Sequence, residues 1–163
     1  MTLQHYLEYF DEAMRRTTPL LKSVPPDKTD WKPTDTSFTI GQQMAHMVGA
    51  IEVYAHGIAR GEWGFDSLRQ RFLMNRRTPS ITKEDALAKL AEFSALFRAQ
   101  LQALSEEEFD RGEIFMPQLN GRVPRWRSAL FFLEHHHLHK GELFMSLKVL
   151  GERVNSLTLY SPQ

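Results

Sequence analysis

The chain lacks cysteine, a long hydrophobic run and an excess of charge of either sign. Without cysteine it has no disulfide framework, no thiolate metal site and no cysteine nucleophile of its own. Lysine plus arginine and aspartate plus glutamate both number 20, so the formal net charge is zero. A balanced chain offers no electrostatic attraction for nucleic acid or an anionic membrane. We therefore expect neither as a partner.

No segment approaches the ~18 consecutive apolar residues of a membrane-spanning helix. Residues 1–10 mix charged and apolar side chains, where a signal peptide would carry an apolar run. The length of 163 residues suits one domain with its own core. These features predict a single soluble domain over residues 1–163, located in the cytoplasm.

Apolar residues recur at helical spacing in four long segments, at about 2–21, 39–60, 82–104 and 124–150. Thr39 and Gln42 are spaced as a capping box at the start of the second segment. Residues 65–81 are arginine-rich and irregular, and Asn120-Gly121 is a strong hairpin signal. The pattern predicts an all-α four-helix bundle with a small hairpin before the last helix.

Four of the seven histidines lie within residues 135–139. His135 and His139 are four residues apart, which places them on one face of a helix, one turn apart. Neutral imidazole is a common ligand of zinc, nickel and related ions. Helical geometry centres this pair on the apolar face, with His136 on its shoulder and His137 pointing outward. The pair predicts half of a metal site.

A third ligand should come from a facing helix, and His46 in the second segment is the candidate. Small residues beside it, Gly49 and Ala50 with Gly57 two turns on, indicate that space is needed there. Three nitrogens with open coordination positions would have the form of a catalytic centre. The alternative is that these histidines are hydrogen-bonded core residues.

A second apolar stripe lies on the opposite side of the last helix, formed by Trp126, Leu130, Leu133, His137 and Phe144. Such a stripe must be covered by something. Another helix of the bundle or a second protomer would do so equally well. The stripe therefore leaves a homodimer open as an expectation.

Two motifs resemble those of the DinB/YfiT-like superfamily, and the likeness extends over nearly the whole chain. FTIGQQMAHM at 38–47, after WKP at 31–33, is similar to the family's aromatic-Ser/Thr-Ile-x5-His pattern. HHHLHKGEL at 135–143, closed by Leu-Gly at 150–151, resembles its His-x3-His-Arg-Gly-Gln-Leu pattern. The resemblance implies an up-down-down-up bundle with a long connection between its second and third helices. It also implies a metal triad of His46, His135 and His139, usually with zinc or nickel.

Two positions depart from the family pattern, with Lys140 in place of arginine and Glu142 in place of glutamine. Lysine lacks the planar fork of a guanidinium group. Glu142 has three interpretations: a metal ligand, a group that orients a ligand, or a partner in a salt bridge.

The resemblance implies an enzyme that uses low-molecular-weight thiols, as bacillithiol S-transferases and mycothiol-dependent isomerases do. In such chemistry the metal lowers the pKa of a cofactor thiol, and a hydrolase would use water in the same way. We expect a small-molecule substrate or thiol in a pocket beside His46, with Gln42, Gly49 and Ala50. The alternative is a non-catalytic, stress-related bundle that binds metal or a small ligand as a dimer.

Overall fold

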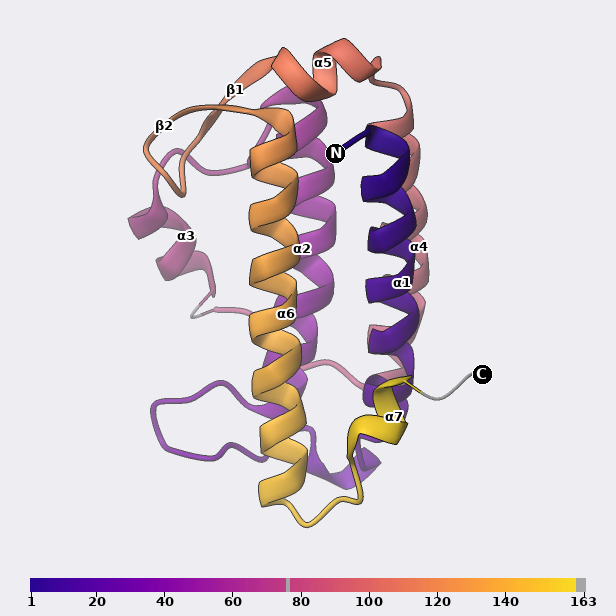
Figure 1. Ribbon diagram of the computed structural model, residues 1–163. Helices are drawn as coiled ribbons and strands as arrows, with labels where there is room; N and C mark the ends of the chain where they lie inside the picture. Colours follow the sequence, from indigo (N-terminus) through magenta and orange to yellow (C-terminus); the bar gives the residue numbers. More distant parts are fainter. Residues whose placement is uncertain (76, 161–163) are drawn as a thin grey trace.

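The computed structural model describes residues 1–75 and 77–160 as a helical bundle with one two-stranded hairpin (Figure 1). The four long helices are α1 (Leu3–Lys22), α2 (Ile40–Arg60), α4 (Lys83–Gln102) and α6 (Arg125–Val149). The short elements are the 3-10 turn η1 (Pro26–Lys28), α3 (Leu68–Asn75), α5 (Glu106–Arg111), β1 (Glu113–Met116), β2 (Gly121–Pro124) and α7 (Ser156–Tyr160). The predicted all-α four-helix bundle is confirmed. No helix in these described ranges is long and apolar enough to cross a membrane.

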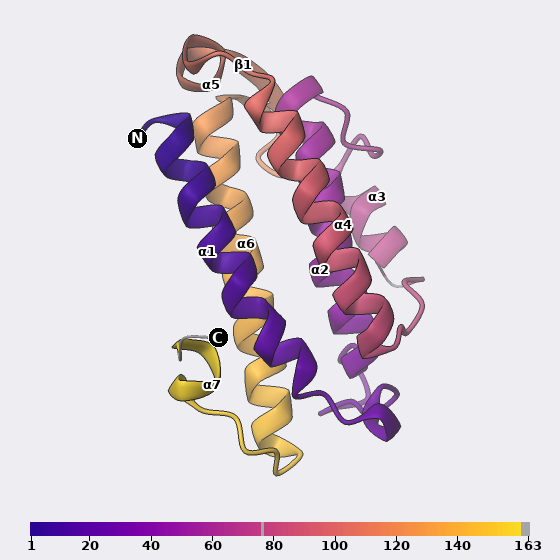
Figure 2. The same cartoon turned by 90° about the vertical axis from the view of Figure 1, so that its right-hand side faces the viewer.

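The helices form two pairs, α1 beside α6 and α2 beside α4, as Figure 2 shows. α2 and α4 begin at the same end of the bundle. There the backbone N–H of Ile81 donates to the carbonyl of Gly41 at 3.4 Å, and a side chain at Gly41 would overlap Ser80. The connection between these parallel helices must therefore travel the length of the bundle. This is the long connection and the up-down-down-up order that the resemblance implied.

Local hydrogen bonds stabilise the N-terminal ends of α2 and α4, close to the predicted positions. At α2, the Gln42 N–H donates to Thr39 Oγ1 at 3.1 Å and the Thr39 N–H donates to Gln42 Oε1 at 3.0 Å. At α4, the Asp85 N–H donates to Thr82 Oγ1 at 3.1 Å. Gly61 ends α2 with φ +75°, a left-handed conformation that glycine adopts without strain.

Aromatic side chains fill the core and fix how α6 sits in the bundle. Phe10 of α1 stacks on Phe97 of α4 with ring centroids 4.3 Å apart, and Phe97 lies 4.9 Å from Phe132 of α6. The buried Tyr6 hydroxyl donates to the carbonyl of Ala129 at 2.9 Å. These contacts set the rotation and height of α6, the helix that carries the clustered histidines.

The expectation of an irregular segment over residues 65–81 was wrong in part, because α3 forms there. In Figure 1, α3 lies outside the bundle, beside α2. None of its described side chains is buried, so the segment has no apolar stripe to show helical periodicity. Just before α3, Trp63 packs on Gly57 and its indole N–H donates to the carbonyl of Phe115 at 2.7 Å. The space predicted beside Gly57 is thus filled by this indole.

The predicted hairpin is present, with Ile114 opposite Val123 in an antiparallel pair. Asn120 has φ +48°, which asparagine tolerates better than most residues. The connection comprises residues 117–120, so Gly121 belongs to β2. α7, which the sequence did not predict, packs beside α1 with the Arg16 guanidinium 4.7 Å from the centre of the Tyr160 ring.

The buried face of α6 differs from the helical-wheel prediction. Leu138 and Val149 are exposed, whereas His136, predicted on the shoulder of the apolar face, is fully buried. Leu133, expected on the outward stripe, is buried too. The reason is that α6 packs against α1 on one side and α2 on the other, so two contacts share its buried surface. Leu133 is therefore unavailable to a dimer contact, and the homodimer itself stays a prediction.

Candidate metal centre

Three histidines from two helices meet in the middle of the bundle: His46 of α2 with His135 and His139 of α6. One ring nitrogen from each lies within 4.8 Å of the other two. The Nε2 atoms of His46 and His139 are 3.1 Å apart. Tetrahedral zinc with nitrogens at about 2.0–2.1 Å needs ligand atoms about 3.3 Å from one another. A small inward movement of the third ring would satisfy that geometry, so this group can hold a divalent metal.

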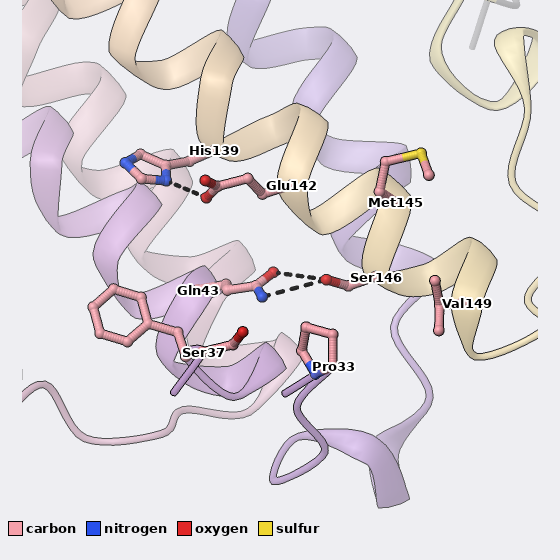
Figure 3. A pocket seen from close by; sticks show the side chains of 9 residues that line it. Pro33, Ser37, Gln43, His139, Glu142, Met145, Ser146 and Val149 are labelled. Carbon is pink, nitrogen blue, oxygen red and sulfur yellow. Dashed lines mark hydrogen bonds and ion pairs between the residues drawn. The ribbon is translucent and has the colours of Figure 1, made fainter. Parts of the chain in front are cut away.

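Glu142 fixes which nitrogen of His139 faces the centre. Nδ1 of His139 donates to Glu142 Oε2 at 2.7 Å, as the dashed line in Figure 3 shows. In a neutral ring this leaves the lone pair on Nε2, which points toward His46. Such a carboxylate partner is typical of metal-binding histidines. The contact fits two of the three interpretations of Glu142, a group that orients a ligand and, with a protonated ring, a partner in a salt bridge.

The ring of His46 faces that of His139 through the same nitrogen. With the proton of His139 on Nδ1, the 3.1 Å contact between the two Nε2 atoms requires His46 to be the donor. An ion between the two rings would take both Nε2 lone pairs as ligands and leave the proton of His46 on its buried Nδ1. A side-chain hydrogen bond with Asn75 acts on this ring and favours its N–H form.

Burial keeps these imidazoles in the form that ligates metals. Burial, with the neighbouring His139, His135 and the Arg71 guanidinium, lowers the pKa of His46 to about 3. Burial, with His139 and Arg71, lowers the pKa of His135 to about 4. Both rings are therefore neutral near pH 7, with free lone pairs.

The family model for the DinB superfamily matches residues 9–143. The chain belongs to the DinB superfamily. The uncharacterized protein YjoA of Bacillus subtilis (strain 168) is 27% identical over 136 residues, which are 83% of this chain and 82% of that protein. A crystal structure of the DinB-like protein YjoA from Bacillus subtilis has a TM-score of 0.71 at 21% identity, over 95% of this chain and 98% of the other. A DinB-like protein from Bacillus cereus ATCC 10987 has a TM-score of 0.72 at 15% identity, over 95% and 97%. Both structures share the DinB fold.

One pocket of this DinB bundle opens beside His139, between the loop before α2 and the end of α6 (Figure 3). It encloses about 430 Å³. Gln43 and Ser146 form its floor and are hydrogen-bonded to each other, with the Gln43 Nε2 donating at 3.3 Å. Phe38 and Met145 add apolar walls. The pocket reaches the triad through His139 and Glu142.

A second pocket, which we call the α3 pocket, reaches the triad through His46 and His135 and encloses about 260 Å³. Its lining is His46, Val53, Tyr54, Leu68, Arg71, Phe72, Asn75, Gln118, Phe131 and His135. Arg71 and Asn75 were not predicted as site residues, because α3 was not predicted. The arginine-rich composition of residues 65–81 was the sequence feature that could have indicated a role for Arg71.

The predicted pocket residues of the DinB site lie in three different settings. Gly49 lines a hollow beside His46, and a side chain there would meet nothing within 4 Å. Ala50 is 2% exposed within the core, so it does not border open space. The Gln42 side chain is occupied by the capping box and by a 2.9 Å bond to the carbonyl of Thr78.

The two other histidines of the cluster lie apart from the metal centre. His136 is buried, with Nε2 2.8 Å from Thr17 Oγ1 of α1. His137 Nδ1 bonds the carbonyl of Leu133 at 2.6 Å. His136 thus corresponds to the alternative of a hydrogen-bonded core histidine.

Proposed function

We propose that this DinB protein binds one divalent ion through His46, His135 and His139 and acts as a metal-dependent transferase that uses a low-molecular-weight thiol. The observation that carries the proposal is the convergence of three imidazoles on one point, with separate open pockets at His139 and at His46 and His135. Zinc or nickel suits this all-nitrogen donor set. When bound, such an ion supplies a Lewis acid that lowers the pKa of a thiol or water ligand.

Two pockets favour a transfer between two reactants over hydrolysis of one. The pocket beside His139 is the larger, and we assign it to the thiol carrier. The α3 pocket would hold the electrophilic substrate against His46 and His135. A thiol must come from outside, since the chain contains no cysteine.

The chain's own residues have three roles in this proposal. Glu142 holds the proton on Nδ1 of His139 and so keeps Nε2 available. Tyr54 lines the α3 pocket and can serve as a hydrogen-bond donor there, since burial raises the pKa of its hydroxyl well above its usual range and keeps it protonated. The aromatic walls around both pockets displace water from the reacting groups.

Metal analysis tests the ligand set. Purified protein loaded with zinc or nickel should carry about one ion per chain, and His46→Ala or His139→Ala should abolish stable occupancy. His137→Ala is the matched control, because its ring bonds the carbonyl of Leu133 and lies outside the centre. Full occupancy in both triad variants would overturn the proposed site.

An activity screen with thiols and electrophiles then tests the reaction. Turnover that needs both metal and thiol supports the transferase. Turnover with water alone would replace it with the hydrolase. Metal-dependent stabilisation without any turnover would leave the alternative of a non-catalytic metal- or ligand-binding bundle.

We also propose that the protein is a homodimer, with a contact surface that differs in part from the predicted one. Leu130 and Leu138 are exposed apolar residues of α6 that line neither the pocket beside His139 nor the α3 pocket. Pairing about a twofold axis, the commonest symmetry of soluble oligomers, would cover them. Light scattering should give twice the chain mass for the native protein and a lower mass for Leu138→Glu; a monomeric native protein would refute the dimer.

A further inference from the structure

Arg71 is a partly buried cation without an acidic partner. Its guanidinium lies 5.5 Å from the centre of the Phe65 ring, and none of the ion pairs among the described residues includes it. Glu52 lines a neighbouring hollow with Arg71 but makes no ion pair with it. Burial lowers the pKa of Arg71, which reflects the cost of removing water from its charge. A partly buried charge that has no ion pair within the described part of the protein would be stabilised by an anion that binds from solution.

The guanidinium lies close to the metal centre. Its charge contributes to lowering the pKa values of both His46 and His135. It lines the α3 pocket together with these two rings, so a ligand that contacts Arg71 also lies beside the triad. α3 thus adds a fixed positive charge to one side of the site.

The remaining lining of the α3 pocket describes the rest of the ligand. Tyr54 and Phe131 have stacked rings with centroids 6.4 Å apart and form an apolar wall, to which Val53 adds. Gln118 Oε1, from the hairpin loop, is buried and has no hydrogen-bond partner in the part of the chain that the structure describes. The pocket therefore combines one cation, an apolar wall and one amide oxygen that has no hydrogen-bond partner among the described residues.

We propose that the α3 pocket binds a small organic carboxylate, with its acid group paired to Arg71 and its apolar or aromatic body against Tyr54 and Phe131. Guanidinium and carboxylate groups match in a planar, two-bond geometry. The volume of about 260 Å³ lies just below the usual range of ~300–1,000 Å³ for ligand pockets, which suits an acid with a single ring. The inference rests on the proposed function, because it names the substrate class of the same site.

A matched pair of probes tests the role of the acid group. Isothermal titration of metal-free protein with 3-phenylpropanoate and with its neutral amide, 3-phenylpropanamide, compares ligands of the same size and apolar body, of which only the acid carries a charge and only the amide has N–H donors. The acid should bind about 10- to 100-fold more tightly, as expected for a charge-assisted pair. Arg71→Gln should abolish that preference, and Arg71→Lys should retain part of it.

Arg69→Gln is the control, because Arg69 is exposed on the same helix and does not line the pocket. This variant should keep the full preference for the acid. Circular dichroism should show all three variants folded, since α3 contributes no buried residue to the core. Equal binding of acid and amide, or a preference that survives Arg71→Gln, would overturn the inference.

Two further arms separate other anion sources and the metal. Inorganic phosphate should compete weakly, because it cannot fill the apolar wall; competition as strong as that of the acid would mean that the pocket takes a lone anion. A preference for the acid over the amide that appears only in zinc-loaded protein, and persists in Arg71→Gln, would mean that the carboxylate binds the metal. That result would overturn the inference and leave the proposed metal site intact. A preference that depends on Arg71 in protein that binds no metal would support the inference while the proposed function fails.

Discussion

His135 and His136 are adjacent in the chain, yet they belong to two regions with different chemistry. His136 lies between α6 and α1, fully buried, with its Nε2 bound to Thr17. His135 lies between α6 and α2, only partly buried, at the edge of an open pocket. In the packed region the protein supplies a hydrogen-bond partner for one ring nitrogen, Nε2 of His136, while its Nδ1 is buried without a partner among the described residues. In the open region, ring nitrogens of three histidines converge on one another, which is the arrangement that a metal ion needs.

The largest expected difference between the two regions is the effect of replacing a histidine by alanine on metal affinity and on the free energy of unfolding. His139→Ala should weaken metal binding by more than about 100-fold. Loss of a residue that only hydrogen-bonds to a ligand costs up to about 100-fold, and loss of the ligand itself should cost more. His136→Ala should leave metal affinity nearly unchanged and lower the free energy of unfolding by about 2–4 kcal/mol, through a lost buried hydrogen bond and a cavity. Chelator competition and urea denaturation measure the two quantities. Equal metal loss in both variants would erase the distinction.

Substitutions of Glu142 test whether metal affinity depends on the carboxylate of this residue. Glu142→Ala should weaken metal binding by about 10- to 100-fold, because Nδ1 of His139 loses the acceptor that orients the ring. Glu142→Gln should retain most of the affinity, since an amide oxygen still accepts that bond. Glu134→Ala, exposed on the same helix, should have no effect. Chelator competition again gives the constants, and an unaffected Glu142→Ala would make the contact incidental.

The pH dependence of stability sharpens the comparison for metal-free protein. Burial lowers the pKa of His136 well below the usual 6.5, so the folded ring stays neutral when the unfolded one takes up a proton. The unfolded state then binds more protons, and stability falls as the pH drops below about 6.5. His136→Gln should reduce this slope by up to about 1.4 kcal/mol per pH unit, the limit for one proton.

The triad rings contribute to the same slope and should behave differently with metal. The folded pKa values of about 3 for His46 and about 4 for His135 give the same sign, with stability lost toward acid. Saturating zinc should stabilise the protein at neutral pH and lose that effect as protons compete for the rings. Urea denaturation from pH 7 to 5, with and without zinc, measures both effects. If the pH dependence of the free energy of unfolding is unchanged in His136→Gln without zinc, the His136 ring is protonated in the folded state.

The sequence by itself determined the features that depend on neighbours along the chain. The cap at Thr39 and the hairpin near Asn120 form within a few residues and were predicted. The four-residue spacing of His135 and His139 placed two rings one turn apart in any helix. The motif around His46 identified the facing ligand through its resemblance to the DinB family.

Only the tertiary structure decided which side of α6 is buried and what surrounds the triad. A helical wheel assumes one apolar direction, but α6 contacts both α1 and α2, so Leu133 and His136 are buried together. α3 has no buried stripe, so its helical state and the position of Arg71 left no periodic signal in the sequence. Local hydrogen bonds and residue spacing act within a few turns, whereas burial and pocket walls come from segments distant in the chain. For that reason the three histidines that converge could be predicted from the sequence, and the residues around them could not.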